Sequence, residues 1–235
     1  MVASPESGQE QPKRETEIEV RTVCADKAQY ESIITTVKKT SEVIRPTCTI
    51  VDERYEIPAL PDTTVRIRGY CTNGVCKYEW TIKTKNKGIV ADDAAPAKVR
   101  SEDVSEQFDT KEQALQALSA RIKELTQQEL SAEEILAKKS FSCTRERTVY
   151  RVNNEECGGL VVSADVFTSW DGVEYDPPLY SLEFEVTVPE DATDEQIAKA
   201  RQRVNECAEK LGAEGVTDKS VVKILRSETA RRTGA

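Results

Sequence analysis

The feature that most constrains this chain is a set of short segments in which charged residues alternate with apolar ones. Glu17-Ile18-Glu19-Val20-Arg21 is one such segment, and Leu182-Glu183-Phe184-Glu185-Val186 repeats the pattern near the other end. Successive side chains of a β-strand point to opposite faces, so the charged residues of each segment share one face. The pattern therefore predicts strands with one apolar face and one face of clustered charge.

Other segments carry the same alternation with positive charge. Arg66 and Arg68 are two residues apart, as are Arg145 and Arg147, and Lys83 lies in a third such segment. Any one of these segments alone is typical of a solvated strand face, because an antiparallel sheet often exposes one side to water. Like charges recur on several segments, however, whereas a solvated face normally mixes signs. We therefore expect these faces to converge in a charged interior that binds a chain of phosphates together with a metal ion.

The composition excludes several classes of function. The 235-residue chain contains no histidine, which excludes a histidine general base, a Ser-His-Asp triad and a zinc site with histidine ligands. Its formal net charge of −9 argues against binding duplex DNA through a basic surface, and no apolar run is long enough to span a membrane. The seven cysteines show no Cys-x-x-Cys spacing, so we expect reduced thiols and an intracellular location.

Turn and capping signals divide the chain into strands and helices. Asn73-Gly74 predicts a hairpin turn between strands at 63–72 and 75–84, which places Cys71 opposite Cys76. The other expected strands are 15–24, 47–55, 98–108, 141–152, 160–169 and 180–188. The expected helices are 27–40, 111–128, 131–139 and 193–211, with a short element at 218–227 and a loop at 85–97.

These elements favour a single domain. We expect residues 1–14 to form a disordered tail, 15–228 to form the folded domain and 229–235 to form a polar tail. About eight strands with helices between them predict an α+β fold, a closed eight-stranded antiparallel β-barrel with helices packed outside. Closure leaves no free sheet edge and provides a lumen. The apolar strand faces would then pack against the helices, and the charged faces would line the lumen.

Such a lumen suits phosphoryl transfer. Carboxylates without histidine or thiolate ligands favour a hard cation, Mg²⁺ or Mn²⁺, and we expect Glu17, Glu19 and Glu185 to hold it. Basic side chains neutralise phosphate oxygens, arginine with two parallel N–H groups. The expected substrate-binding residues are Arg21, Arg66, Arg68, Lys83, Arg100, Arg145, Arg147 and Asp165. The expected catalytic residues are Glu183, Arg66, Arg147 and Lys83, with Glu183 or Asp165 orienting a water molecule.

The order of these motifs resembles that of the CYTH or triphosphate tunnel metalloenzyme superfamily. The motifs that carry the resemblance are Glu17-Ile18-Glu19, Arg66-Ile67-Arg68, Thr81-Ile82-Lys83, Arg145-x-Arg147, Asp165 and Glu183-Phe184-Glu185. They extend over residues 15–188, which is nearly all of the expected domain. The resemblance implies an eight-stranded β tunnel and metal-dependent hydrolysis of the γ-phosphate of a triphosphate.

Within the superfamily, the later motifs are most similar to the metal-dependent RNA 5′-triphosphatases of fungal and protozoan mRNA capping. Arg145-x-Arg147 is followed by a strand with Asp165 and then by the strand with Glu183 and Glu185. This resemblance implies a triphosphate-ended RNA substrate, a guanylyltransferase partner and a nuclear location. The alternatives are an inorganic tripolyphosphatase, a thiamine or nucleoside triphosphatase or a class IV adenylyl cyclase, all cytoplasmic, or a polyphosphate-binding tunnel without turnover.

Overall fold

The structure is a computed structural model, and it describes residues 15–85, 98–189, 191–213 and 221–234. The expected tail at 1–14 and most of the expected loop at 85–97 lie outside these ranges. The described strands are β1 (Glu15–Val23), β2 (Ser41–Tyr55), β3 (Thr63–Thr72), β4 (Val75–Lys85), β5 (Lys98–Val104), β6 (Lys139–Val152), β7 (Val161–Trp170) and β8 (Val173–Pro189). The described helices are α1 (Lys27–Lys39), α2 (Lys111–Thr126), α3 (Ala132–Leu136), α4 (Asp194–Lys210) and α5 (Val221–Thr233).

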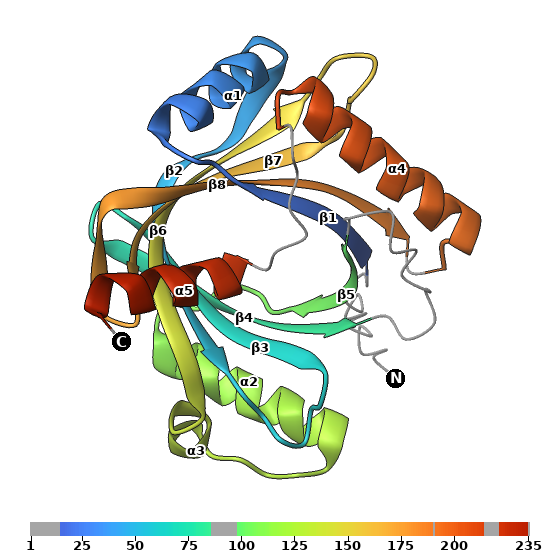
Figure 1. Ribbon diagram of the computed structural model, residues 1–235. Coiled ribbons are helices and arrows are strands. Elements are labelled where there is room, and N and C mark those ends of the chain that lie inside the picture. The colour runs from blue at the N-terminus through green and yellow to red at the C-terminus, as the bar shows by residue number, and fades with distance from the viewer. Residues whose placement is uncertain (1–14, 86–97, 190, 214–220, 235) are drawn as a thin grey trace, which may run out of the picture.

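All of these strands belong to one antiparallel sheet that curls around a central axis (Figure 1). The strand order is β1-β5-β4-β3-β2-β6-β7-β8, and β1 also pairs with β8, so hydrogen-bonded pairing continues around the ring. The pairings of β5 with β1 and with β4 are short, because β5 has seven residues. The eight-stranded antiparallel sheet with helices outside it is confirmed.

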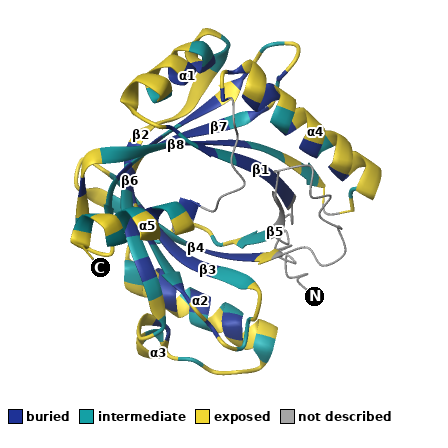
Figure 2. Cartoon of the chain, in the orientation of Figure 1, coloured by how far each residue is buried: buried dark blue, intermediate teal, exposed yellow. Residues whose placement is uncertain are grey.

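Helices cover the outer face of the sheet at two places, and a further helix, α5, lies at one end of the ring (Figures 1 and 2). Helices α1 and α4 pack over β1 and β8, where Val37 and Val204 are fully buried. Helix α2 packs over β3 and β4 through a stripe that includes Leu118. Helix α5 lies against the strands near one end of the ring, where Leu225 shares an apolar cluster with Trp170. The apolar face of the sheet therefore points outward, and its charged face is left for the lumen.

The helix starts follow the capping signals in the sequence. The Asp26 side chain accepts a hydrogen bond from the backbone of α1, and Thr110, Ser131 and Thr193 each form a capping box. These caps satisfy backbone N–H groups that the first turn of a helix leaves without partners. Gly212, with φ of +94°, follows the end of α4. The predicted caps are confirmed.

Strands β3 and β4 form the hairpin that Asn73 and Gly74 predict. Both turn residues have positive φ, at 52° and 80°, which a tight turn of this kind requires. The register is the predicted one and pairs Arg66 with Thr81. Because neighbouring residues of a strand face opposite sides, Arg66 points inward while Ile67 joins the apolar cluster under α2.

Some strand boundaries differ from expectation. Strand β2 begins at Ser41 rather than at residue 47, and β8 begins at Val173 rather than at residue 180. Each therefore passes through a proline, Pro46 or Pro177, that lies outside the expected strand. These prolines lie at irregularities in the pairing, where the sheet does not need their missing N–H. Strand β5 ends at Val104, short of the expected residue 108.

Two helical expectations are also wrong. The helical spacing of Leu115, Leu118, Ile122 and Leu125 predicts one buried stripe on α2, but Leu125 is 43% exposed, because the last turn of this helix lies beyond the apolar cluster. Helix α5 continues to Thr233, although the polar residues after 228 suggested a tail. Arg231 and Arg232 both pair with Glu228 one turn earlier, which supports the helical conformation there.

The expectation of reduced thiols is contradicted by two disulfides. Cys71 and Cys76 face each other across the hairpin with their Cα atoms 4.1 Å apart, and they are bonded. Cys157, between β6 and β7, is bonded to Cys207 of α4. The second pair is separated by 50 residues in the sequence, and only the packing of α4 brings its members together.

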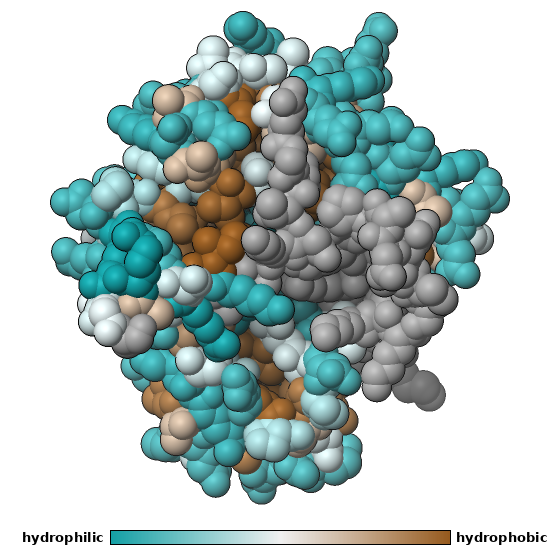
Figure 3. All heavy atoms as spheres, in the orientation of Figure 1, coloured by the Kyte–Doolittle hydropathy of each residue, from teal (hydrophilic) through white to brown (hydrophobic). Residues whose placement is uncertain are grey.

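The outside of the molecule is mostly hydrophilic on the face that Figure 3 shows, with apolar residues visible in the gaps between polar ones. The helices place exposed residues outward and buried residues toward the sheet (Figure 2). None of the described helices is both long and apolar enough to cross a membrane.

Candidate active site in the lumen

Charged side chains from all eight strands meet on the inner face of the sheet. The buried ones are Glu17, Glu19, Asp52, Arg66, Arg68, Lys83, Arg145, Arg147, Asp165 and Glu183, each no more than 8% exposed. Arg21, Glu102 and Glu185 are half-buried. Burying so many charges in one place is costly unless they are paired or bind a ligand. How these charges are paired therefore decides what the lumen can do.

Four glutamates form the acidic side of the lumen. They come from β1 and β8, whose register places Glu19 opposite Glu185, and Glu17 and Glu183 lie beside them. Burial, together with the nearby Glu17 and Glu183, raises the pKa of the Glu185 carboxyl to about 9. Burial also raises the pKa of Glu19, and Glu183 adds to this effect although Arg21 opposes it. The carboxylates of this cluster therefore repel one another when they are ionised.

Two basic side chains from β1 and β4 contact the acidic cluster. Lys83 forms a short ion pair with Glu17. Arg21 forms a short ion pair with Glu183, and its Nη2 atom lies 3.3 Å from Oε2 of Glu19. Glu185 makes no ion pair with the described residues. The acidic cluster is therefore only partly neutralised by the protein.

Arg147 and Asp165 connect the acidic cluster to the basic side of the lumen. The guanidinium of Arg147 donates two hydrogen bonds to the Asp165 carboxylate, of 2.7 and 2.6 Å, and a third of 2.9 Å to Glu183. Arg145 lies 3.0 Å from the same aspartate. Burial alone would raise the pKa of Asp165, but Arg147 and Arg145 hold that pKa below its usual value. Asp165 therefore stays ionised and fixes both arginines.

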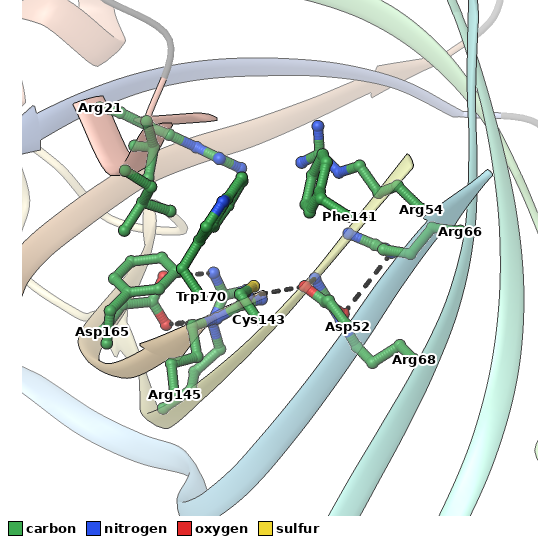
Figure 4. A pocket seen from close by; sticks show the side chains of 14 residues that line it. Arg21, Asp52, Arg54, Arg66, Arg68, Phe141, Cys143, Arg145, Asp165 and Trp170 are labelled. Carbon is green, nitrogen blue, oxygen red and sulfur yellow. Dashed lines mark hydrogen bonds and ion pairs between the residues drawn. The ribbon is translucent and has the colours of Figure 1, made fainter. Parts of the chain in front are cut away.

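Asp52 of β2 sits among three arginines on the basic side (Figure 4). Its carboxylate accepts hydrogen bonds from Arg68, of 2.7 and 3.1 Å, and from Arg145, of 2.6 Å. The Nε atom of Arg66 is 4.0 Å away. Burial opposes ionisation of Asp52, yet Arg145, Arg68 and Arg66 lower its pKa well below the usual value. Asp52 thus neutralises these arginines from within the protein, as a bound anion would.

Glu102 completes the network from β5. Its carboxylate lies 3.7 Å from Nη2 of Arg66 and 3.4 Å from Nζ of Lys83. Lys83 in turn pairs with Glu17 of β1. Ion pairs therefore connect the inner faces of all eight strands in one continuous ring.

A small cavity lies at the end of the lumen nearest α5. Its volume is about 20 Å³, enough for about one water molecule. Figure 4 shows arginines and aspartates on several sides of it, together with Phe141 and Trp170. Val221 and Leu225 of α5 also line the cavity.

The structure brings together nearly every residue that the sequence singled out. The residues that meet in the lumen are Glu17, Glu19, Arg21, Arg66, Arg68, Lys83, Arg145, Arg147, Asp165, Glu183 and Glu185. Arg100 is opposite Glu17 in the β1–β5 register, and its side chain lies outside the described part of the structure. The roles of these residues in binding and catalysis remain predictions.

Sequence reasoning missed three members of the site, namely Asp52, Arg54 and Glu102. Asp52 and Arg54 are two apart in β2 but have opposite charges, so a search for repeated like charges passes over them. The intervening Glu53 is also charged, which hides the alternation of faces. A useful signal would have been the register of β2 against β3, which pairs Asp52 with Arg68.

The acidic cluster has the donor chemistry for a hard divalent cation. Within the described residues, no three Asp, Glu, Cys or His side chains are already arranged to hold a metal ion. Lys83 and Arg21 hold Glu17 and Glu19 in ion pairs instead. Yet the raised pKa of Glu185 marks a carboxylate cluster short of positive charge, which a divalent cation would supply. The glutamates therefore fit Mg²⁺ or Mn²⁺ once the two basic side chains turn away.

The chain belongs to the CYTH family. A model of the CYTH domain matches residues 15–219. A comparison with curated protein sequences finds no match.

Solved structures share this fold. The PH1819 protein of Pyrococcus horikoshii OT3 is 19% identical with a TM-score of 0.59, over 90% of this chain and 99% of that one. HpAC1 of Hippeastrum, described as a candidate adenylyl cyclase with a dominant triphosphatase activity, is 16% identical with a TM-score of 0.55, over 90% and 96%. A chain of the Schizosaccharomyces pombe Mediator head module is 11% identical with a TM-score of 0.52, over 85% and 96%. At these identities the similarity establishes the fold alone.

Proposed function

We propose that this chain hydrolyses the terminal phosphate of a triphosphate with the help of a divalent cation, and that its substrate is the 5′-triphosphate end of RNA. The observation that carries the proposal is the ring of buried acids and bases in the lumen of a CYTH domain. Such a ring costs free energy of folding compared with an apolar interior. The presence of the ring therefore supports a site that binds a charged ligand.

Hydrolysis of a phosphate chain needs positioning and charge neutralisation more than covalent help from the protein. Glu17, Glu19 and Glu185 would hold Mg²⁺ or Mn²⁺, which when bound supplies polarisation of the terminal phosphate. Arg66 and Arg147 would donate hydrogen bonds to the phosphate oxygens. A guanidinium can do so with two parallel N–H groups, which fixes the orientation of the phosphate.

Glu183 is the candidate for orienting the attacking water molecule. Burial would raise its pKa, but Arg21 and Arg147 lower it well below the usual value, so its carboxylate is ionised at neutral pH. An ionised carboxylate accepts hydrogen bonds, and a water molecule bound to it would have its lone pairs free for attack. Asp165 acts through Arg147 and Arg145 and is therefore a positioning residue.

RNA as the substrate is supported by the order of the later motifs, Arg145-x-Arg147, Asp165 and Glu183-x-Glu185. A guanylyltransferase partner and a nuclear location follow if the substrate is RNA. A small-molecule triphosphatase is the second candidate, and the triphosphatase activity described for HpAC1 favours it. A binding module without turnover is a third, since a chain of the Mediator head module shares the fold.

A phosphate-release assay separates these candidates. Triphosphate-ended RNA, tripolyphosphate, ATP and thiamine triphosphate are compared at equal concentration with Mg²⁺ or Mn²⁺, and Glu19→Gln serves as the inactive control. The proposal expects release from RNA to have the highest kcat/KM and to be abolished by chelation. A higher kcat/KM for a small triphosphate would establish the second candidate. If the wild-type chain releases phosphate from none of these substrates, the third candidate, a binding module without turnover, is the one supported.

A further inference from the structure

We propose that Arg54 and Arg66 form an additional anion subsite at the α5 end of the lumen, which takes a phosphate group of the substrate. This inference rests on the proposed function, because it extends the same site. It adds Arg54, a residue that carries no like-charged neighbour two positions away in the sequence.

The strand registers bring the two arginines together. Arg54 is paired with Arg66 of β3 on one side and with Phe141 of β6 on the other. Figure 4 shows the two guanidinium groups near each other, with Arg54 lying against Phe141. Residues directly opposite each other in an antiparallel pair have adjacent side chains, and like charges there destabilise the sheet. Something must compensate for this repulsion when the site is in use.

The described residues supply that compensation for Arg66 only in part, through Glu102 at 3.7 Å and a 3.0 Å hydrogen bond from Nη2 of Arg66 to Oγ1 of Thr81, and they supply none for Arg54. Arg54 makes no ion pair with them, and the Nε atoms of Arg54 and Arg66 are both buried without a hydrogen-bond acceptor. Asp52 also lies 4.0 Å from Nε of Arg66, but Arg68 and Arg145 already bond to its oxygens. Burial lowers the pKa of Arg54 to about 9, and the positive charge of Arg66 adds to this effect. Arg54 is thus a charged side chain of the lumen without an ion pair among the described residues, and its neighbour Arg66 keeps a buried Nε atom without an acceptor.

The surroundings fit an oxyanion. The guanidinium carbon of Arg54 is 4.8 Å from the centroid of the Phe141 ring, and that ring stacks on Trp170 at 4.3 Å. These rings hold the Arg54 side chain in place and keep water away, which strengthens its attraction for an anion. A phosphate oxygen accepts hydrogen bonds and donates none when ionised, so it satisfies the orphaned N–H groups. A cation would not, because it repels the guanidinium groups and accepts no hydrogen bond.

The test measures binding of tripolyphosphate and of triphosphate-ended RNA by calorimetry in Arg54→Gln. The matched control is Arg45→Gln, on the same strand, because Arg45 also lies over an aromatic ring, that of Tyr70, but is exposed. Loss of a charge-assisted hydrogen bond weakens binding by about 10-fold or more. We expect this loss in Arg54→Gln and unchanged affinity in Arg45→Gln. If Arg54→Gln weakens the binding of just one of the two ligands, that ligand is the one whose phosphate group occupies the subsite.

Thermal unfolding without ligand gives a second readout, because a merely structural role predicts the opposite sign. Removing an unpaired buried charge should leave the melting temperature of Arg54→Gln equal to or above that of the wild type. Equal affinity of Arg54→Gln and wild type for both ligands, or a lower melting temperature without ligand, would overturn the subsite. Binding through Arg54 without any phosphate release would instead keep the subsite and overturn the proposed hydrolysis.

Discussion

Asp52 of β2 and Arg145 of β6 form a buried ion pair of 2.6 Å inside the curled sheet. Arg68 contacts the same carboxylate at 2.7 Å. The aspartate therefore does inside the protein what a phosphate oxygen would do in a complex. It neutralises arginines that would otherwise repel one another.

Asp52→Asn should consequently change stability and anion binding in opposite directions. Removing one partner of a buried ion pair costs about 3–5 kcal/mol of unfolding free energy. The freed arginines should bind inorganic phosphate more tightly, so phosphate should restore more stability to the variant than to the wild type. Urea unfolding with and without phosphate measures both effects. Equal gains of stability from phosphate in the two proteins would show that Asp52 does not compete with anions.

Arg147→Lys tests whether the site needs the parallel N–H groups of a guanidinium. Lysine keeps the positive charge but replaces the planar fork that now binds Asp165 and Glu183. We expect phosphate release to fall by about 10²-fold, a loss typical of removing one donor to developing charge. Arg203→Lys, at an exposed position of helix α4 outside the sheet, is the control and should keep full activity. Wild-type rates in Arg147→Lys would contradict the assignment.

The sequence predicted the inward charge because period-two alternation is a local property. Glu17, Glu19, Arg66 and Arg68 could be placed on shared faces without knowing how their strands pair. The turn at Asn73-Gly74 was equally local, since both residues tolerate the positive φ it needs.

What the sequence could not supply was information about pairing between distant segments. Asp52 matters because β2 lies between β3 and β6, and the disulfide of Cys157 with Cys207 exists because α4 packs beside the loop that follows β6. The length of α5 was missed for a related reason. Its buried residues, such as Leu225, are defined by packing against the end of the sheet.

Glu185 predicts how stability depends on pH when divalent cations are absent. Its pKa of about 9 in the folded chain exceeds the unfolded value of about 4.3, so between these pH values the folded state binds a proton that the unfolded state has lost. The free energy of unfolding should therefore fall as pH rises through this range, by up to about 1.4 kcal/mol per pH unit. Urea unfolding at several pH values in a chelator measures it.

Glu185→Gln should flatten this dependence, whereas Glu174→Gln, an exposed position on the same strand, should not. Asp52 and Glu183 act in a separate window, because their lowered pKa values cost stability only as the pH falls below the unfolded pKa of each carboxyl. An unchanged slope in Glu185→Gln would exclude Glu185 as its source.

The two disulfides should contribute unequally to stability. A cross-link stabilises the fold by restricting the unfolded chain, and more so when the closed loop is longer. For separations of 50 and 5 residues this gives about 4 kcal/mol for Cys157–Cys207 and about 2 kcal/mol for Cys71–Cys76. Urea unfolding of Cys207→Ser and Cys76→Ser under oxidising conditions measures the difference. A larger loss in Cys76→Ser would contradict the chain-entropy explanation.

The most direct measurement is a crystal structure of the protein with Mn²⁺ and tripolyphosphate, located by the anomalous signal of manganese. The account predicts the ion between Glu17, Glu19 and Glu185, and phosphate oxygens on Arg66 and Arg147. Manganese and tripolyphosphate bound outside the lumen, with the internal ring of ion pairs intact, would contradict it.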